Sequence, residues 1–145
     1  MRLPKPEPGL VIRYSYLWLR EHRAGREDGT KDRPCAIVLT SRADAGETQV
    51  LVVPVTHSRP DGDTAALELP LSVKQHLGLD TERSWVVLSE SNLFDWPGPD
   101  LRPLDDRGDS SVAYGYLPPR LFSELRRRFL ALDAASRSRR VQRTE

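Results

Sequence analysis

The sequence predicts a β-rich α+β fold, a small β-barrel with a short inserted helix and a closing C-terminal helix. Short runs of β-branched and aromatic residues recur along the chain, separated by polar stretches that contain glycine or proline. One long segment, residues 118–132, repeats its apolar residues with the period of a helix. A chain of 145 residues has the length of one domain with its own hydrophobic core.

The first half of the chain contains three predicted strands. Residues 10–18 are dense in β-branched and aromatic side chains. Residues 34–39 and 50–55 are continuous apolar runs, which is typical of strands buried on both faces. A polar turn with one glycine joins them into a hairpin, and Pro54 is expected at a bulge or an edge because it has no N–H. The charged segment at 20–32 is predicted to be a long exposed loop.

The second half is expected to hold two shorter strands, at 67–69 and 84–89, with one or two helical turns between them. Ser72 is the expected cap of these turns and Gly78 their end. Residues 92–109 contain three prolines and two glycines and are predicted to be loop. Two prolines open the last helix. Its expected apolar face is formed by Leu121, Phe122, Leu125, Phe129, Leu130 and Leu132.

The C-terminal end of the chain is basic. Residues 120–145 contain eight arginines and three acidic residues, although the formal net charge of the whole chain is only +1. The sequence divides into a barrel domain at 1–135 and a basic, flexible tail at 136–145. Such an end suits contacts with RNA phosphates or an acidic partner. A solvated helix face followed by a frayed tail is the simpler interpretation, and we prefer it.

Several classes of protein are disfavoured by what the chain contains. Its single cysteine, Cys35, cannot form an intrachain disulfide and suits a reducing compartment. No apolar run approaches the roughly 20 residues of a membrane span, and no secretory signal is readable, so a cytoplasmic protein is expected. His22, His57 and His76 lack the spacing of metal ligands, so neither a metal nor another cofactor is predicted. Phosphate-binding glycine loops and nucleophile elbows are also missing from the sequence.

Polar residues stand at the ends of the two buried strands. Arg33 precedes the first strand, and Thr56, His57 and Ser58 follow the second. If the two strands are antiparallel neighbours, the first begins where the second ends. The sequence therefore predicts that Arg33 lies near Thr56 and Ser58, at an edge where a rigid scaffold holds functional side chains.

Together these segments resemble the PemK/MazF family of type II toxins, which act in plasmid maintenance and growth inhibition. The similar features are an opening Gly-hydrophobic strand, an Arg-Pro pair before an apolar strand, and a Pro-hydrophobic-Thr end of the next strand, at residues 9–12, 32–39 and 51–58. Two later segments resemble the family as well: Leu77-Gly78-Leu79 with Ser84, and Gly115-Tyr116-Leu117. The matching segments keep the family's order across residues 9–132.

The resemblance implies a small SH3-like barrel of the MazF/PemK toxin type that forms a homodimer. It implies a metal-independent, sequence-selective endoribonuclease that acts on single-stranded RNA and leaves 2′,3′-cyclic phosphate and 5′-hydroxyl ends. It also implies a cognate antitoxin, with DNA binding by the complex of the two. The family's catalytic Arg and Thr correspond here to Arg33 and Thr56. The chain departs from the family in its long first loop, in its tail, and in His57, where many relatives have a small residue.

The chemistry of RNA cleavage is consistent with these residues. RNA supplies its own nucleophile, the 2′-hydroxyl, so an enzyme must add a proton acceptor, a proton donor and positive charge at the phosphate. Arg33 offers a fixed fork of donors, and because an arginine is a poor base at neutral pH its first role is electrostatic stabilisation. Thr56 adds a hydroxyl, with turn capping as the alternative. His57 titrates in the right range to move a proton, but strand alternation places it opposite Thr56 and favours a structural histidine.

Further RNA contacts are predicted from the charged loop, through His22, Arg23, Arg26 and Lys31, and from Ser58. A solvated charged loop explains the loop residues equally well. Base stacking is a weaker interpretation than packing in the core or in a dimer interface for the three tryptophans, Trp18, Trp85 and Trp96.

Two other functions remain as alternatives. The first is a non-catalytic PemK-like barrel that binds nucleic acid or a protein partner, and the presence of both Arg33 and Thr56 favours the enzyme over it. The second is a related toxin that acts on gyrase, and the Arg-Pro and Pro-Val-Thr elements argue against it.

Overall fold

The computed structural model describes residues 3–27, 29, 31–59, 61, 65–105 and 111–143. Its helices and strands follow one another as β1 (Leu10–Tyr14), α1 (Leu19–Arg23), β2 (Arg33–Arg42), β3 (Thr48–Thr56), β4 (Ala66–Glu68), α2 (Leu71–His76), β5 (Trp85–Val87), β6 (Glu90–Trp96), β7 (Ala113–Tyr116), α3 (Pro119–Ala134) and β8 (Arg139–Gln142). The β-rich α+β class is therefore confirmed.

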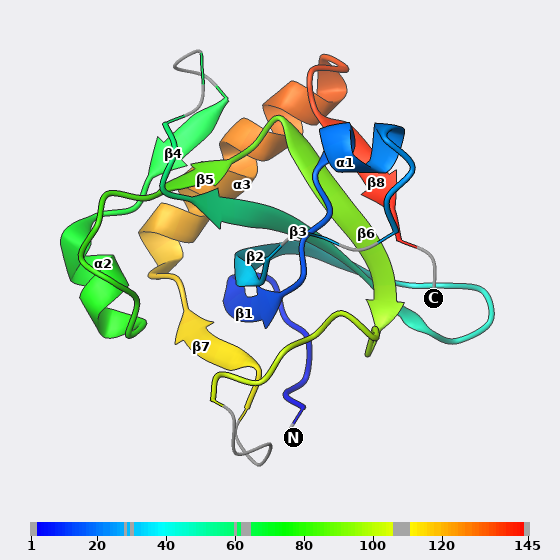
Figure 1. Cartoon of the computed structure of the whole chain (residues 1–145), viewed down its shortest axis with the longest axis horizontal. Coiled ribbons are helices and arrows are strands. Elements are labelled where there is room, and N and C mark those ends of the chain that lie inside the picture. The colour runs from blue at the N-terminus through cyan, green and yellow to red at the C-terminus, as the bar shows by residue number, and fades with distance from the viewer. Residues whose placement is uncertain are drawn as a thin grey trace.

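The strands form one sheet in the order β4-β5-β3-β2-β1-β7, with β6 beside β3 and β8 beside β6. Neighbouring strands are antiparallel, except that β6 and β8 are parallel. In Figure 1, β3 runs through the middle of the sheet and α3 lies behind it. The long hairpin of β2 and β3 is thus the part of the sheet to which the other strands are added.

The sheet does not close into the predicted barrel. In the part of the chain that the structure describes, β4 and β7 each pair with one strand only. These edge strands have three and four residues, and the chain leaves them for α2 and α3. Edges this short do not meet, whereas a barrel needs an unbroken ring of hydrogen-bonded strands. The prediction of a closed barrel is therefore corrected to an open sheet.

The predicted hairpin is confirmed as β2 and β3, which pair in an antiparallel register that places Cys35 opposite Pro54. On its other side, β3 pairs with β6 over residues 48–52 and with β5 at residues 55–56. Pro54 falls in the gap between these two partners. A strand tolerates a residue without an N–H at such a position.

The hairpin is buried on both faces, as its apolar runs predict. Alternate residues of β2 and β3 enter two different clusters. One cluster lies under α3 and includes Ala36, Val38, Val53, Leu125, Phe129 and Leu132. The other includes Cys35, Ile37, Val52, Tyr14 and Phe94. The rings of Tyr14 and Phe94 stack with their centroids 4.6 Å apart.

Both helices predicted in the second half of the chain are confirmed, with changes in detail. Pro70, not Ser72, precedes the first turn of α2. The chain leaves this helix through Gly78, whose φ of +71° suits glycine. On α3, Leu130 is 40% exposed, because it follows the buried Phe129 by one residue and so lies on a different side of the helix.

The C-terminal segment differs from its prediction. Residues 139–142 form β8 beside β6, and Val141 and Arg143 are buried. Arg143 forms an ion pair with Asp100 at 2.8 Å and donates to the carbonyl oxygen of Ser15 at 2.7 Å. The expected flexible tail is therefore wrong for residues 139–143, because a strand pairing and a buried ion pair hold them to the sheet. Residues 144–145 lie outside the described part.

Two segments predicted to be loops contain regular structure. Strand β6 occupies the region from residue 90, and α1 occupies the start of the charged segment. The carboxylate of Glu21 accepts from the N–H of Trp18 at 3.1 Å and so begins α1. The remainder of these two predicted loops includes residues 28, 30 and 106–110, which lie outside the described part.

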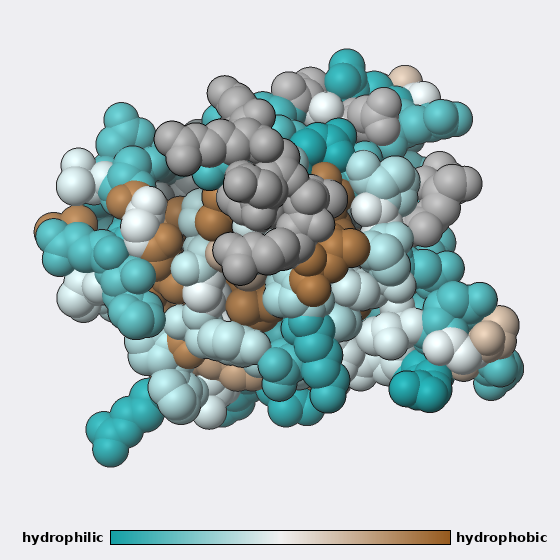
Figure 2. Space-filling view, turned by 90° about the horizontal axis from the view of Figure 1, so that it is seen from below, coloured by the Kyte–Doolittle hydropathy of each residue, from teal (hydrophilic) through white to brown (hydrophobic). Residues whose placement is uncertain are grey.

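The surface seen from the side of β7 and the N-terminus has apolar side chains near its centre and hydrophilic ones around them (Figure 2). Among the described residues, the exposed large hydrophobic side chains are Leu3, Leu71, Tyr116 and Leu130. A helix long and apolar enough to cross a membrane is not found in the described residues.

Candidate functional site

The site lies where β2 begins and β3 ends. Arg33 is the first residue of β2 and Thr56 the last of β3, and the antiparallel register brings the two ends together. Two adjoining cavities, of about 300 Å³ and about 420 Å³, open there. Both are lined by Lys31, Arg33, Thr56 and His57. The predicted proximity of Arg33 to Thr56 is confirmed.

The guanidinium of Arg33 is held by its surroundings. Its Nη1 donates to the carbonyl oxygen of Val55 at 3.2 Å, and its Cζ lies over the ring of Trp18, 5.0 Å from the ring centroid. Its Nε is buried and has no hydrogen-bond partner among the described residues. Burial lowers the pKa of Arg33, but a guanidinium in a protein stays charged at neutral pH. The site therefore contains a fixed positive charge.

Among the described residues, the hydroxyl of Thr56 has one hydrogen bond. Its Oγ1 accepts from the N–H of Ser58 at 3.2 Å, which is the turn-capping contact considered from the sequence. A hydroxyl that accepts one bond keeps its own proton for donation. Capping and contact with a substrate are therefore compatible for Thr56.

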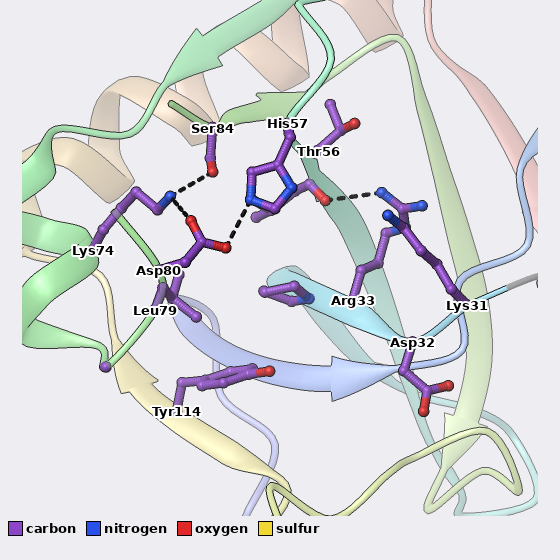
Figure 3. A pocket seen from close by; sticks show the side chains of 13 residues that line it. Lys31, Asp32, Arg33, Thr56, His57, Lys74, Leu79, Asp80, Ser84 and Tyr114 are labelled. Atoms are coloured by element: carbon purple, nitrogen blue, oxygen red, sulfur yellow. Dashed lines mark hydrogen bonds and ion pairs between the residues drawn. The ribbon is translucent and has the colours of Figure 1, made fainter. Parts of the chain in front are cut away.

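His57 belongs to a chain of contacts that ends on a buried lysine (Figure 3). Its Nε2 lies 2.7 Å from Oδ2 of Asp80 and 3.5 Å from Oε2 of Glu82. Oδ1 of Asp80 accepts from Nζ of Lys74 at 2.5 Å. Lys74, which is 2% exposed, also donates to Oγ of Ser84 at 2.7 Å and to the carbonyl oxygen of Glu82. The hydrogen bond from Lys74, and after it that from His57, lowers the pKa of Asp80.

The fold brings together a donor set that histidine spacing does not reveal. The ligand atoms of His57, Asp80 and Glu82 lie within 4.8 Å of one another, and all three residues are exposed. The two carboxylates follow the histidine by more than 20 residues, so the set forms no local motif in the sequence. The ammonium of Lys74 already neutralises the carboxylate of Asp80. A divalent cation bound to this carboxylate would lie beside the positive charge of Lys74, which would repel it. We therefore assign no metal to these residues.

Glu90 is a functional candidate that sequence reasoning missed. It begins β6 and lines the larger cavity with Arg33 and His57. Its Oε1 accepts from the hydroxyl of Tyr16 at 3.0 Å and from the N–H of Leu19 at 2.9 Å. Burial raises the pKa of Glu90, against the opposing effect of these two bonds. The signal in the sequence is a carboxylate two residues beyond the apolar run at 85–88.

The residues predicted to contact RNA fall in different places. Lys31 lines both cavities and Ser58 lines the larger one. His22 and Arg26 line a separate cavity of about 210 Å³. Arg23 lines none of these three cavities. Arg26 lies 3.9 Å from the carboxylate of Glu21. The structure thus brings Lys31 and Ser58 to Arg33 and leaves the other three apart from it.

Aromatic and basic residues add to the wall of the larger cavity. Trp18 is 8% exposed, with the guanidinium of Arg20 over its ring at 5.2 Å and that of Arg33 at 5.0 Å. Trp85 is also 8% exposed, so packing is the observed role of both tryptophans. Arg20 and Arg59 line the cavity with Lys31 and Arg33. Asp61 and Glu90 line it as well, so four basic residues outnumber two acidic ones, and this excess favours an anionic ligand.

Comparisons of the chain with protein-family models and with curated proteins find no match.

Proposed function

We propose that this protein is a metal-independent endoribonuclease that cleaves single-stranded RNA, a toxin of the PemK/MazF type. The observation that carries the proposal is the meeting of Arg33, His57 and Glu90 at one basic cavity. A phosphodiester brings negative charge to such a cavity. Its cleavage by the 2′-hydroxyl requires the three chemical functions that these side chains supply.

Each residue has a role in the proposed reaction. Arg33 stabilises the charge that builds on the phosphate oxygens, through donors that are already oriented. His57 accepts the proton of the attacking 2′-hydroxyl. Glu90 donates a proton to the departing 5′-oxygen, because burial raises its pKa and so favours its protonated form. Thr56 contributes a hydroxyl beside Arg33.

The cavity also suits the dimensions and chemistry of a nucleotide. A volume of about 420 Å³ falls within the roughly 300–1,000 Å³ of typical ligand pockets. Two guanidinium groups cover the ring of Trp18, so we expect phosphate contacts, not base stacking on this tryptophan, to dominate binding.

The proposal extends to the assembly. We expect a homodimer whose subunits have an open version of the SH3-like sheet, and a cognate antitoxin that binds the toxin. The exposed Leu71 and Tyr116 are candidates for the dimer contact because large apolar side chains are costly to leave in water. Light scattering at micromolar concentration tests this, and a monomer mass contradicts it.

The function is tested with purified protein and a long RNA of mixed sequence in excess chelator. We expect discrete cleavage sites with 2′,3′-cyclic phosphate and 5′-hydroxyl ends, and no cleavage by the Arg33→Ala variant. Cleavage only after addition of a divalent metal overturns the metal-free mechanism. Binding of the RNA without cleavage instead supports the alternative of a non-catalytic module.

A further inference from the structure

We infer that Asp80, held in place by the buried Lys74, is a positioning residue that orients the ring of His57 and sets which ring nitrogen carries the proton. The inference rests on the proposed function and adds a residue that the catalytic assignment above does not include. It explains how an exposed histidine at a strand end becomes a proton acceptor of defined geometry.

The first step is the anchoring of Lys74. Its ammonium is 2% exposed and is satisfied by Asp80, by Ser84 and by the carbonyl oxygen of Glu82. A lysine buried to this extent is stable only when it is fully paired. Asp80 is therefore tied at Oδ1 to α2, which leaves Oδ2 directed at the ring of His57.

The second step is the choice of tautomer. An ionised carboxylate only accepts hydrogen bonds, so Nε2 of a neutral His57 carries the proton that it donates to Asp80 at 2.7 Å. The other nitrogen, Nδ1, is then the acceptor. In Figure 3 the ring stands between Asp80 and Arg33, with Nδ1 on the side of Arg33. The side chain of His57 is 45% exposed, so a substrate can reach it.

The position of His57 also removes the objection from strand alternation. Thr56 is the last residue of β3, and His57 lies beyond the strand. The alternation of faces does not extend past the end of a ladder. Both residues line the two cavities, although they are neighbours in sequence.

In the proposed step, Nδ1 of His57 takes the proton of the 2′-hydroxyl while the 2′-oxygen forms a bond to phosphorus. The bond from phosphorus to the 5′-oxygen breaks, and this oxygen takes the proton of Glu90. The products are a 2′,3′-cyclic phosphate and a 5′-hydroxyl, with His57 protonated and Glu90 ionised. Exchange of one proton each with water restores the enzyme. Asp80 takes no proton and stabilises the imidazolium that forms.

The test uses Asp80→Asn in the full chain. Lys74 still needs an acceptor, so the amide oxygen should face the ammonium and the amide NH₂ should face Nε2 of His57. Nε2 must then accept, and the ring proton should move to Nδ1. Ring ¹⁵N chemical shifts at about pH 8, above the ordinary histidine pKa of about 6.5, report this change directly. Cleavage should fall by about 10²-fold or more, the usual contribution of a general base.

Glu82→Gln is the matched control, because the carboxylate of Glu82 is also close to Nε2 of His57, whereas Lys74 bonds to the backbone carbonyl oxygen of Glu82, which the substitution keeps. It should keep the proton on Nε2. The positioning role is overturned if Asp80→Asn changes neither the tautomer of His57 nor the rate of cleavage. If that cleavage still requires Arg33, the proposed ribonuclease function stands. If the tautomer changes as expected but the wild-type protein cleaves no RNA, the positioning of His57 by Asp80 is supported and the ribonuclease function is overturned.

Discussion

Arg33 at the start of β2 donates from its Nη1 to the carbonyl oxygen of Val55, one residue before the end of β3, at 3.2 Å. The bond links the two ends of the central hairpin through a backbone atom. Changes of side chain at Thr56 or His57 therefore leave this anchor in place. The positive charge of the site is preorganised by the register of the sheet itself, and a preorganised charge is the most effective kind in catalysis.

Replacement of Arg33 tests the charge at this position. Arg33→Ala should slow RNA cleavage by about 10²–10³-fold, as loss of a transition-state donor does in other enzymes. Arg33→Lys keeps a charge but not the fork of donors, so its cleavage rate should lie between those of wild type and Arg33→Ala. The loss of the contact with the buried Trp18 should cost about 1–2 kcal/mol. Single-turnover rates and urea unfolding check the two effects separately. Full activity of a folded Arg33→Ala protein contradicts the assignment.

Thr56→Val, which retains the side-chain shape, should slow cleavage less than Arg33→Ala does.

Replacement of Glu90 tests the proton donor. Glu90→Gln keeps the shape of the side chain and should slow cleavage of ordinary RNA by about 10²-fold or more. An RNA with sulfur in place of the departing 5′-oxygen has a leaving group that needs no proton. This substrate should restore the rate of Glu90→Gln and should not restore that of His57→Ala. Equal rescue of both variants would show that the two roles are assigned wrongly.

The same variant should change the pH dependence of stability. Burial raises the pKa of Glu90, so the folded state binds this proton more tightly than the unfolded state does. The contribution of Glu90 to stability is then complete below its unfolded pKa and is lost as the pH rises through its folded pKa. Glu90→Gln should therefore unfold at a higher urea concentration than wild type at pH 7, and the difference should shrink at pH 4. A constant difference at both pH values argues against a raised pKa of Glu90 in the folded protein.

How much the sequence predicts depends on the distance between interacting residues along the chain. The central hairpin has a short turn and a continuous apolar pattern, so its register and the proximity of Arg33 to Thr56 were predictable. The partner of His57 comes from residue 80, and that contact depends on how α2 packs. Composition does not encode such a contact.

The C-terminal strand illustrates the same limit. Val141 is the one buried apolar residue of β8, and a single apolar residue is no pattern. The position of this strand depends on the ion pair between Arg143 and Asp100, which are more than 40 residues apart in the chain. The prediction of a closed barrel was wrong for a related reason. Local patterns identify strands, but the length of the edge strands decides whether a sheet can close.

The RNA-binding surface can be mapped with a 2′-O-methyl oligonucleotide, which has no nucleophile and is not cleaved. Lys31→Ala should weaken binding and reduce the slope of log K against log salt by about 0.7, the value for one lost contact with a single-stranded phosphate. Arg23→Ala should leave the slope unchanged, because Arg23 lines neither cavity at Arg33. If Arg23→Ala reduces the slope and Lys31→Ala does not, the RNA follows the loop predicted from the sequence and not the cavity.

The C-terminal strand should be important for stability through Arg143. Its side chain is 1% exposed, and besides Asp100 and Ser15 it donates to Oδ1 of Asn92 at 3.1 Å and to the hydroxyl of Tyr14 at 3.2 Å. Arg143→Ala removes the cation at 2.8 Å from the carboxylate of Asp100, which is 10% exposed and keeps the more distant Arg102 at 3.9 Å. Removal of one member of a buried ion pair costs about 3–5 kcal/mol.

Arg140 provides the matched control for this measurement. It belongs to the same strand, but its side chain is 44% exposed and lies 3.7 Å from Asp133. Exposed pairs contribute about 0–1 kcal/mol, so Arg140→Ala should unfold close to wild type in urea, and Arg143→Ala should unfold much earlier. Because Arg143 also bonds to the backbone of the segment that leads to Trp18, Arg143→Ala should increase hydrogen exchange at Leu17 and Trp18. Equal unfolding midpoints for the two variants would mean that β8 adds no stability to the sheet.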